Sequence, residues 1–235
     1  MPPLPFWYGV RIEQVTPHAV AHVLIGYRPE RQSPVSRKIG SWFMFEFLRK
    51  KKPLVVAVTL NARLRPLDRA DVEDAFEEAL TKHGHGVRVV GGGTSMTPDG
   101  EVSECDIQIE LDNPSDKMIA TVIGALEAIL APKGSRLQVP GRDQSIAFGV
   151  QEGLALYLNG TDLPKAVYAD CDVNHVFDEC ERLLEGIGGV NSYWEGPRET
   201  ALYMYGADFI TMRERLAPLL ESYPLCRQCR IEQIA

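Results

Sequence analysis

Apolar and polar positions recur in a regular order from Pro53 to the C-terminus. Residues 54–64 are rich in β-branched and aliphatic side chains and lie between two prolines, which predicts a strand. An apolar face at helical spacing follows through residues 72–80, with Asp68 or Asp71 as the expected N-cap. Residues 87–90 predict a second strand, and the strict alternation over 105–111 predicts a third. The turn signal Pro98-Asp99-Gly100 joins these two strands into a hairpin.

The same order of elements then occurs twice. Ser115 or Asp116 caps a second predicted helix that runs to residue 130, and residues 136–139 form a closing strand. After a linker at 140–152, a strand is predicted at 154–158, a helix at 172–184 and a hairpin of strands at 192–195 and 200–205. A helix begins at Asp208, and the last strand covers 230–234.

This pattern predicts an α+β fold of two ferredoxin-like β-α-β-β-α-β units with antiparallel sheets. The predicted boundaries are an N-terminal extension at 1–52, a first unit at 53–140 and a second unit at 152–235. Strong sequence identity between the units is lacking, so the duplication is inferred from the order of elements. The spacing leaves open whether the units join their sheets or pack sheet on sheet.

Composition limits the classes of function. The chain has 235 residues, a net charge of −7 and 45% hydrophobic residues, as in ordinary globular proteins. The negative charge favours a basic protein partner, and we expect no nucleic-acid partner. No apolar run is long enough to span a membrane, and no signal peptide is recognised, so a cytoplasmic location is expected. Five cysteines form an odd set, which predicts reduced thiols.

Three local motifs have both a chemical and a structural interpretation. The run Gly91-Gly92-Gly93 resembles an anion-binding loop, but it leads into a hairpin, which favours a bulged strand edge. Cys226 and Cys229 form a single CxxC, and with Cys171 and His175 they allow a zinc site on paper; core packing is the favoured interpretation. His18 and His22 lie four residues apart with no third ligand nearby. The sequence therefore predicts no metal, no cofactor and no catalytic residue.

Two groups of side chains are candidates for partner binding. Acidic residues crowd the first helix, and aromatic residues with a carboxylate occupy the second predicted hairpin. The alternatives are a solvated helix face and a sheet face packed on the other unit. The candidate residues are Asp71, Glu73, Asp74, Glu77, Tyr193, Trp194 and Glu195.

Several phrases of the sequence are similar to phrases in a family of uncharacterised bacterial proteins. They are Val90 to Thr94, Asp99-Gly100-Glu101, Cys105-Asp106-Ile107, Ala131 to Ser135 and Tyr193 to Gly196, within residues 60–235. The resemblance implies no catalytic residue. Small acidic α+β proteins of this kind are also similar in character to bacterial immunity proteins that neutralise toxins, an analogy of class.

Two functional hypotheses follow. The first is a non-enzymatic protein-binding module, an immunity-type inhibitor that docks on a basic bacterial toxin. The alternative is an enzyme or small-molecule sensor that binds its ligand between the two units, with Arg63, Arg65, His83, His85 and Trp194 as lining residues. The sequence does not predict the oligomeric state.

Overall fold

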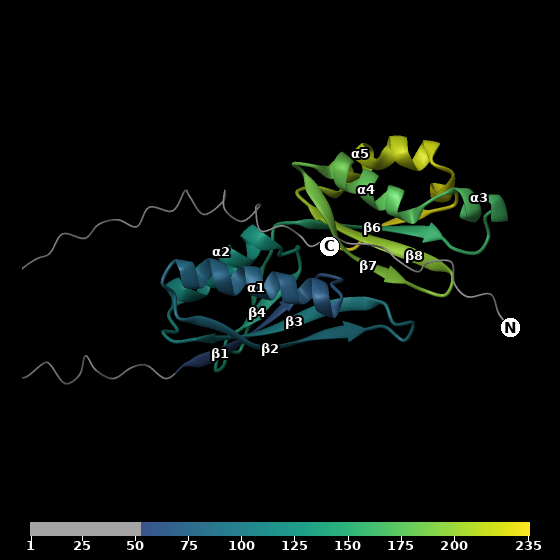
Figure 1. Cartoon of the computed structure of the whole chain (residues 1–235). Coiled ribbons are helices and arrows are strands. Elements are labelled where there is room, and N and C mark those ends of the chain that lie inside the picture. Colours follow the sequence, from purple (N-terminus) through teal and green to yellow (C-terminus); the bar gives the residue numbers. More distant parts are fainter. Residues whose placement is uncertain (1–52) are drawn as a thin grey trace, which may run out of the picture.

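The computed structural model describes residues 53–235, which form two ferredoxin-like α+β units (Figure 1). The first unit contains β1 (Leu54–Leu60), α1 (Pro66–Lys82), β2 (Val87–Met96), β3 (Val102–Leu111), α2 (Asp116–Ile129), β4 (Ser135–Gln138) and β5 (Ile146–Phe148). The second contains β6 (Glu152–Asn159), α3 (Lys165–Asp170), α4 (Val173–Leu184), β7 (Gly188–Glu195), β8 (Glu199–Gly206), α5 (Phe209–Ser222), the 3-10 helix η3 (Pro224–Cys226) and β9 (Arg230–Gln233). The predicted fold class is confirmed.

Both sheets are antiparallel and have the same topology. The first has the strand order β2-β3-β1-β4-β5 and the second β7-β8-β6-β9. The β2–β3 pair and the β7–β8 pair carry a bulge at the same place. It lies between Val89 and Gly91 in β2 and between Val190 and Ser192 in β7. The two units are therefore structural duplicates down to a local irregularity, and the bulged-edge interpretation of the glycine run is confirmed.

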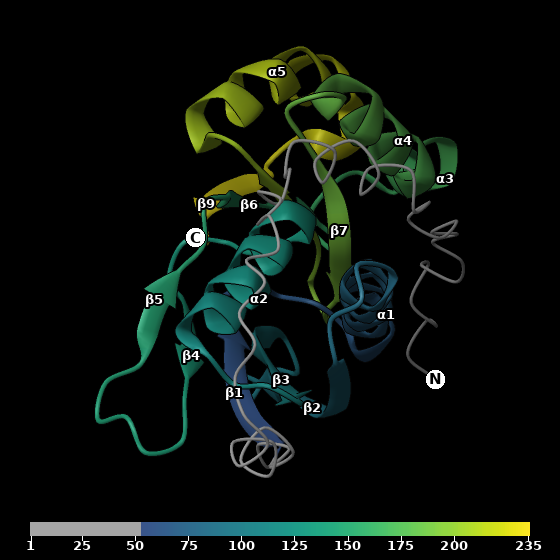
Figure 2. The same ribbon diagram turned by 90° about the vertical axis from the view of Figure 1, so that its left-hand side faces the viewer.

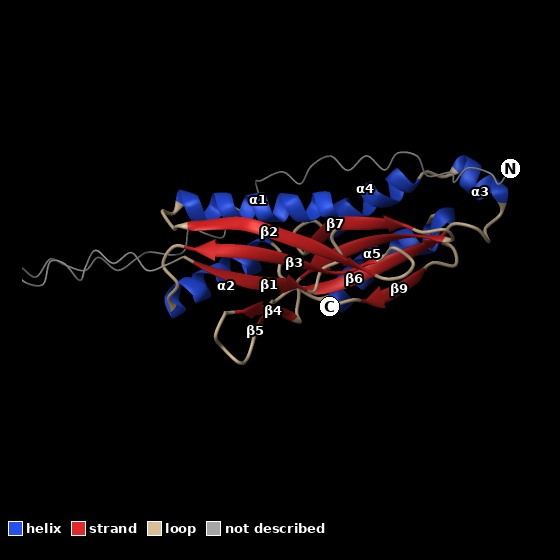
Figure 3. Cartoon of the chain, turned by 90° about the horizontal axis from the view of Figure 1, so that it is seen from below, coloured by secondary structure: helices blue, strands red, loops and turns tan. Residues whose placement is uncertain are grey.

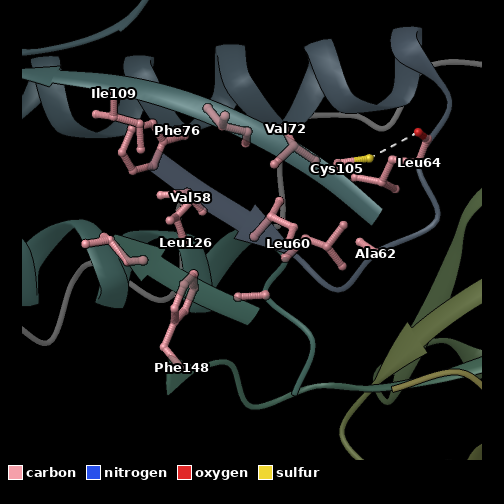
Figure 4. Packing of buried hydrophobic residues seen from close by; sticks show 14 of the residues in the cluster. Val58, Leu60, Ala62, Leu64, Val72, Phe76, Cys105, Ile109, Leu126 and Phe148 are labelled. Carbon is pink, nitrogen blue, oxygen red and sulfur yellow. Dashed lines mark hydrogen bonds between the residues drawn. The ribbon is translucent and has the colours of Figure 1, made fainter. Parts of the chain in front are cut away.

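The helices cover one face of each sheet. In Figures 1 and 2, α1 and α2 lie on the first sheet and α4 and α5 on the second. Alternate residues of β1 and β3 face α1 and α2, and Figure 4 shows Phe76 and Leu126 packed against Val58 and Ile109. Burial of these side chains supplies the main driving force for the unit. The Cys105 thiol donates a hydrogen bond to the Leu64 carbonyl at 3.3 Å.

The starts of α2, α4 and α5 follow the capping rules, whereas α1 and α3 begin without a side-chain cap. Ser115 accepts a hydrogen bond from the Met118 amide, and Asp208 accepts one from the Thr211 amide. The prediction that Asp68 or Asp71 caps α1 is wrong, because the helix begins at Pro66 with no side-chain cap. A proline in the first turn gives up no intrahelical hydrogen bond, so the helix starts earlier than its acidic residues suggest.

Three elements lie outside the predictions. β2 extends to Met96 through the glycine run, α3 precedes α4, and β5 lies inside the predicted linker and adds a fifth strand to the first sheet. The first sheet thus continues past the predicted unit boundary at residue 140. The predicted extension at 1–52, with His18 and His22, lies outside the described residues.

Candidate functional site: the covered and open sheet faces

The second sheet is buried on both faces. Every residue of β6 from Gly153 to Leu158 is buried, as is every residue of β8 from Thr200 to Gly206. On the face turned away from α4 and α5 lie Ala155, Tyr157, Ala201, Tyr203 and Tyr205, and these side chains belong to the same hydrophobic cluster as the core of the first unit. We call this the covered face. Figure 3 shows the two sheets as neighbours seen from below.

A carboxylate fixes the covered face to the first unit. Glu101, at the β2–β3 turn, accepts hydrogen bonds from the Tyr157 hydroxyl at 2.6 Å and the Tyr203 hydroxyl at 2.7 Å. Arg63, in the β1–α1 loop, ion-pairs with Glu101 and donates to the Tyr157 hydroxyl at 2.5 Å. We call these four residues the Glu101 cluster. Its ion pair is largely buried, with side-chain exposures of 24% for Arg63 and 18% for Glu101.

The surroundings hold the Glu101 cluster in one protonation state. Burial raises the pKa of Glu101, but hydrogen bonds from the two tyrosines and the charge of Arg63 outweigh it, so the carboxyl titrates below its ordinary range. Burial and the bond to Glu101 raise the pKa of Tyr157 to about 12, and raise that of Tyr203 further. At neutral pH the cluster therefore contains one carboxylate, one guanidinium and two neutral phenols.

A second set of polar contacts joins the units beside the Glu101 cluster. The Arg65 amide donates to the Ser192 hydroxyl at 3.1 Å, and that hydroxyl donates to Asp68 at 2.5 Å. The Arg65 guanidinium makes a bidentate ion pair with Asp68 and lies 3.6 Å from the centre of the Tyr193 ring. The amide of the Arg63 residue also donates to the Tyr205 hydroxyl at 2.7 Å. These contacts place Arg63 and Arg65 in the interface itself.

The groove predicted between the units is not supported by this geometry. Its two arginines already have partners across the interface, Tyr157 for Arg63 and Tyr193 for Arg65, and Trp194 packs against the first unit's hydrophobic cluster. His83 is the C-cap residue of α1 and is exposed, while His85 follows it with intermediate burial. Arg63, Arg65 and Trp194 thus lie in the interface between the units. His83 and His85 lie at the C-terminal end of α1.

The acidic candidates on α1 have different environments. Asp71 and Asp74 are exposed. Glu73 ion-pairs with Arg69 at 3.1 Å, and Glu77 accepts a hydrogen bond from the Val89 amide at 2.8 Å. Glu77 therefore fixes α1 to the edge strand β2, whereas the ion pair of Glu73 lies within α1.

The aromatic candidates on β7 lie at the unit interface. Tyr193 and Trp194 are both of intermediate burial, and Glu195 is exposed. Tyr193 lies under Arg65, and Trp194 packs against the first unit. The alternative interpretation from the sequence, a sheet face packed on the other unit, describes Trp194, whereas Tyr193 packs against the second unit's own cluster and meets the first unit through Arg65.

The first sheet has an open face, which the sequence analysis did not identify. It is the face turned away from α1 and α2, and its rows follow from the strand register. Thr59 donates to Asp106 at 2.8 Å, and ion pairs join Arg88 to Glu110 and Arg136 to Glu104. The face is mainly polar, and carries no aromatic side chain among the described residues. We define the open face as Val55, Ala57, Thr59, Arg88, Glu104, Asp106, Gln108, Glu110, Arg136 and Gln138.

The apolar pattern separates the two sheets only in part. Strand β1, with the sequence Leu-Val-Val-Ala-Val-Thr-Leu, is nearly as apolar as Leu154 to Leu158, although β1 alternates buried and wetter positions and β6 is buried throughout. A continuous apolar run is typical of a strand buried on both faces, so this pattern alone would assign β1 incorrectly. The neighbouring strands differ more clearly, because β3 alternates apolar residues with charged and amide residues, whereas β8 does not.

The described residues contain no candidate metal centre and no membrane-spanning helix. No three of their histidine, cysteine and acidic side chains are grouped to hold an ion. The longest apolar helices within 53–235 are too short or too polar to cross a bilayer. All five cysteines are free thiols.

Comparisons with known proteins give a likeness to solved structures but to no family. No family model matches the chain, and no curated protein matches it. Among solved structures, the first two RRM domains of yeast poly(U) binding protein, Pub1, are similar at 12% identity and a TM-score of 0.21. The match covers 77% of this chain and 99% of that one.

These findings correct two sequence predictions. The immunity-type inhibitor of a basic toxin is not retained, because the neighbour is a pair of RRM domains and not an immunity protein. The statement that nucleic acid is not a partner is also withdrawn, since the neighbour is named as a poly(U) binding protein. The second prediction rested on the charge of the whole chain. Nine of its 25 Lys and Arg residues but only three of its 32 Asp and Glu residues lie at 1–52. The net charge of the whole chain therefore averages a basic segment at 1–52 with an acidic part at 53–235.

Proposed function

We propose that the chain binds single-stranded nucleic acid, with its basic segment as the phosphate-binding part and the open face as the adjoining surface. The observation that carries this proposal is the segregation of charge along the chain. Residues 53–235 contain 16 basic and 29 acidic residues, whereas 1–52 contain nine and three. Basic segments attached to folded units are typical of proteins that bind polyanions.

The basic segment ends directly at the first sheet. Arg49, Lys50, Lys51 and Lys52 are consecutive and precede Pro53, and β1 begins at Leu54. β1 is a central strand of the open face, and its first open-face residue is Val55. Four consecutive basic residues are therefore separated by a single proline from a strand whose open face is covered by none of the helices within 53–235.

The side chains of the open face suit weak polar contacts rather than base stacking. Sheet-binding RNA domains stack bases on aromatic side chains. Here the central positions are Ala57, Thr59 and Gln108, and two of the three neighbouring carboxylates are paired with arginines. We therefore expect affinity to come mainly from phosphate contacts and to show little base preference.

Salt dependence tests this mechanism. We expect the full chain to bind a fluorescent oligouridine in an anisotropy titration, with four phosphate contacts giving a slope of log K against log salt of about −2.8. Affinity then falls about 50-fold between 50 and 200 mM salt, an order-of-magnitude value from the same relation. An oligoadenosine of equal length should bind within a few-fold.

Two sets of variants locate the contact. Replacing Arg49, Lys50, Lys51 and Lys52 together by glutamine should abolish most of the salt slope. The matched control neutralises four exposed cations of the second unit, Lys165, Arg213, Arg215 and Arg227, and should leave the slope unchanged. Gln108→Lys should strengthen binding, and Gln108→Glu should weaken it. Absence of binding at low salt, or equal effects of the two quadruple variants, would contradict the proposal.

The proposal retains the resemblance to a bacterial family, the predicted unit boundaries and the cytoplasmic location. Its tests do not depend on any of these three. The acidic and aromatic candidates from Asp71 to Glu195 likewise remain predicted partner contacts, and the variants above do not depend on them.

A further inference from the structure

Four of the five cysteines gather in one core, that of the second unit. Cys180 and Cys226 are buried in its hydrophobic cluster, and Cys171 and Cys229 pack against it with intermediate burial. Two of these thiols belong to the Cys226-Arg227-Gln228-Cys229 motif, which links η3 to the edge strand β9. The proposed binding function uses none of them.

The backbone between Cys226 and Cys229 is a tight turn. The Cys229 amide donates to the Cys226 carbonyl at 3.2 Å. Arg227 has φ −63° and ψ 137°, and Gln228 has φ 59°. These are the angles of a type II turn, which ordinarily carries glycine at its third position. The chain holds a glutamine there, although a left-handed conformation is strained for such a residue.

This turn brings the two cysteines to the separation that a disulfide requires. The ends of a β-turn lie less than about 7 Å apart at Cα, and disulfides span roughly 4.4–6.8 Å. The Cα separation of positions i and i+3 in such a turn therefore overlaps the range that disulfides span. Cys226 is 2% exposed, while Cys229 is the more accessible of the pair.

We propose that Cys226 and Cys229 are a modification site, at which a low-molecular-weight disulfide such as oxidised glutathione reversibly oxidises the two thiols to an intramolecular disulfide. The Cys229 thiolate attacks one glutathione sulfur, the glutathione S–S bond breaks, and one glutathione thiolate leaves and takes up a proton. The Cys226 sulfur then loses its proton and attacks the Cys229 sulfur, which releases the second glutathione. Two protein thiols are oxidised, and one glutathione disulfide is reduced to two thiols.

The surroundings make this exchange slow at neutral pH. Burial raises the pKa of Cys226 to about 12, with smaller contributions from Cys229 and Cys171, and burial raises that of Cys229 as well. The thiolate is the attacking species, so few molecules react at any moment. The order of attack follows from access, with Cys229 first and Cys226 as the resolving thiol.

Peptide mapping of the full chain identifies the pair. After equilibration with oxidised glutathione and blocking of free thiols, trypsin cuts after Arg227, inside the proposed disulfide loop. Peptides 216–227 and 228–230 should therefore remain joined without reductant and separate with it. The intact protein should have lost two hydrogens. Linkage to peptide 166–182, which carries Cys171 and Cys180, would overturn the assignment, as would a persistent glutathione adduct or five free thiols.

Two variants separate this pair from the neighbouring thiol. Cys229→Ser should abolish the loss of two hydrogens, and Cys171→Ser should leave it unchanged. Gln228→Gly keeps the turn and relieves its strain, so it should preserve the disulfide. A Cys171→Ser protein that no longer forms the link would assign the disulfide to Cys171 and refute the proposal.

Discussion

The two units share a topology but use the face opposite their helices in contrasting ways. Through the strand register, Tyr203 of β8 pairs with Ala155 and Ser192, and Gln108 of β3 pairs with Ala57 and Gly91. Tyr203 and Gln108 thus occupy equivalent positions, as do Tyr157 and Thr59. In the second unit this face is aromatic and covered, and in the first it is polar and open. One backbone plan therefore gives either an internal interface or an exposed surface, and the side chains decide which.

The edge strands differ in the same way. Where β2 has Gly91, Gly92 and Gly93, the register places Ser192, Tyr193 and Trp194 of β7. Tyr193 and Trp194 contact the first unit through Arg65 and its hydrophobic cluster. The glycines leave room for α1 to reach the edge of its own sheet. The aromatic residues of β7 therefore make contacts between the two units. The glycines of β2 instead allow close packing of α1 within the first unit.

The largest expected effect comes from removing an aromatic ring of the covered face. Tyr203 is fully buried, and Tyr203→Ala should lower the free energy of unfolding by about 3–5 kcal/mol, through the lost ring and the cavity it leaves. Gln108→Ala at the equivalent open position should change it by about 0.5 kcal/mol or less. Urea unfolding of the full chain measures both. Similar losses at the two positions would show that the open face is covered in solution.

The Glu101 cluster gives a smaller effect with a defined pH dependence. Glu101→Gln removes the charge that pairs with Arg63 and one acceptor for the two tyrosines, at a cost of about 1.5–3 kcal/mol at pH 7. The folded protein lowers the pKa of this carboxyl, so its stabilisation is present above the ordinary pKa and is lost as the pH falls through the folded value. The difference between wild type and variant should therefore shrink below about pH 4.5.

Exposed Glu195 provides the control for this measurement. Glu195→Gln should leave the free energy of unfolding unchanged within about 0.5 kcal/mol at every pH. If the difference in free energy of unfolding between wild type and Glu101→Gln stayed constant from pH 7 to pH 3, the Glu101 carboxylate would not be the charged centre of the interface. Comparison of these two variants distinguishes the pH dependence that comes from the Glu101 cluster from the loss of stability that any acidic protein shows at low pH.

The periodic parts of the fold were predictable, and the contacts between units were not. Alternation in β3 and helical spacing in α1, α2 and α4 locate those elements within a few residues. β2 is longer than predicted because glycines carry no hydrophobic pattern, and β5 has only three residues. Arg63 and Glu101 belong to a loop and a turn, and Tyr203 lies 102 residues from Glu101. No local pattern encodes such a pairing, although β8 lacks the polar alternation of β3 and so already indicates a strand buried on both faces.

The smallest effect distinguishes two adjacent glycines of β2. A Cβ at Gly92 would lie 2.7 Å from the Asp106 carbonyl oxygen of β3 and 2.6 Å from a Glu73 oxygen, whereas a Cβ at Gly93 meets nothing within 4 Å. The carbonyl belongs to the neighbouring strand and cannot move aside without breaking the ladder. Gly92→Ala should therefore cost about 1–2 kcal/mol. Gly93→Ala should be neutral or stabilise slightly, because alanine restricts the unfolded chain.

Thermal unfolding of the two alanine variants tests this difference under identical conditions. Neither glycine has a positive φ, so the backbone conformation does not require glycine at either position. The difference in stability between the two alanine variants therefore measures the steric contact of the added methyl group. A Gly92→Ala protein as stable as wild type would contradict the close packing of Glu73 and β3 on Gly92, since only a displaced Glu73 and a shifted strand make room for the methyl group.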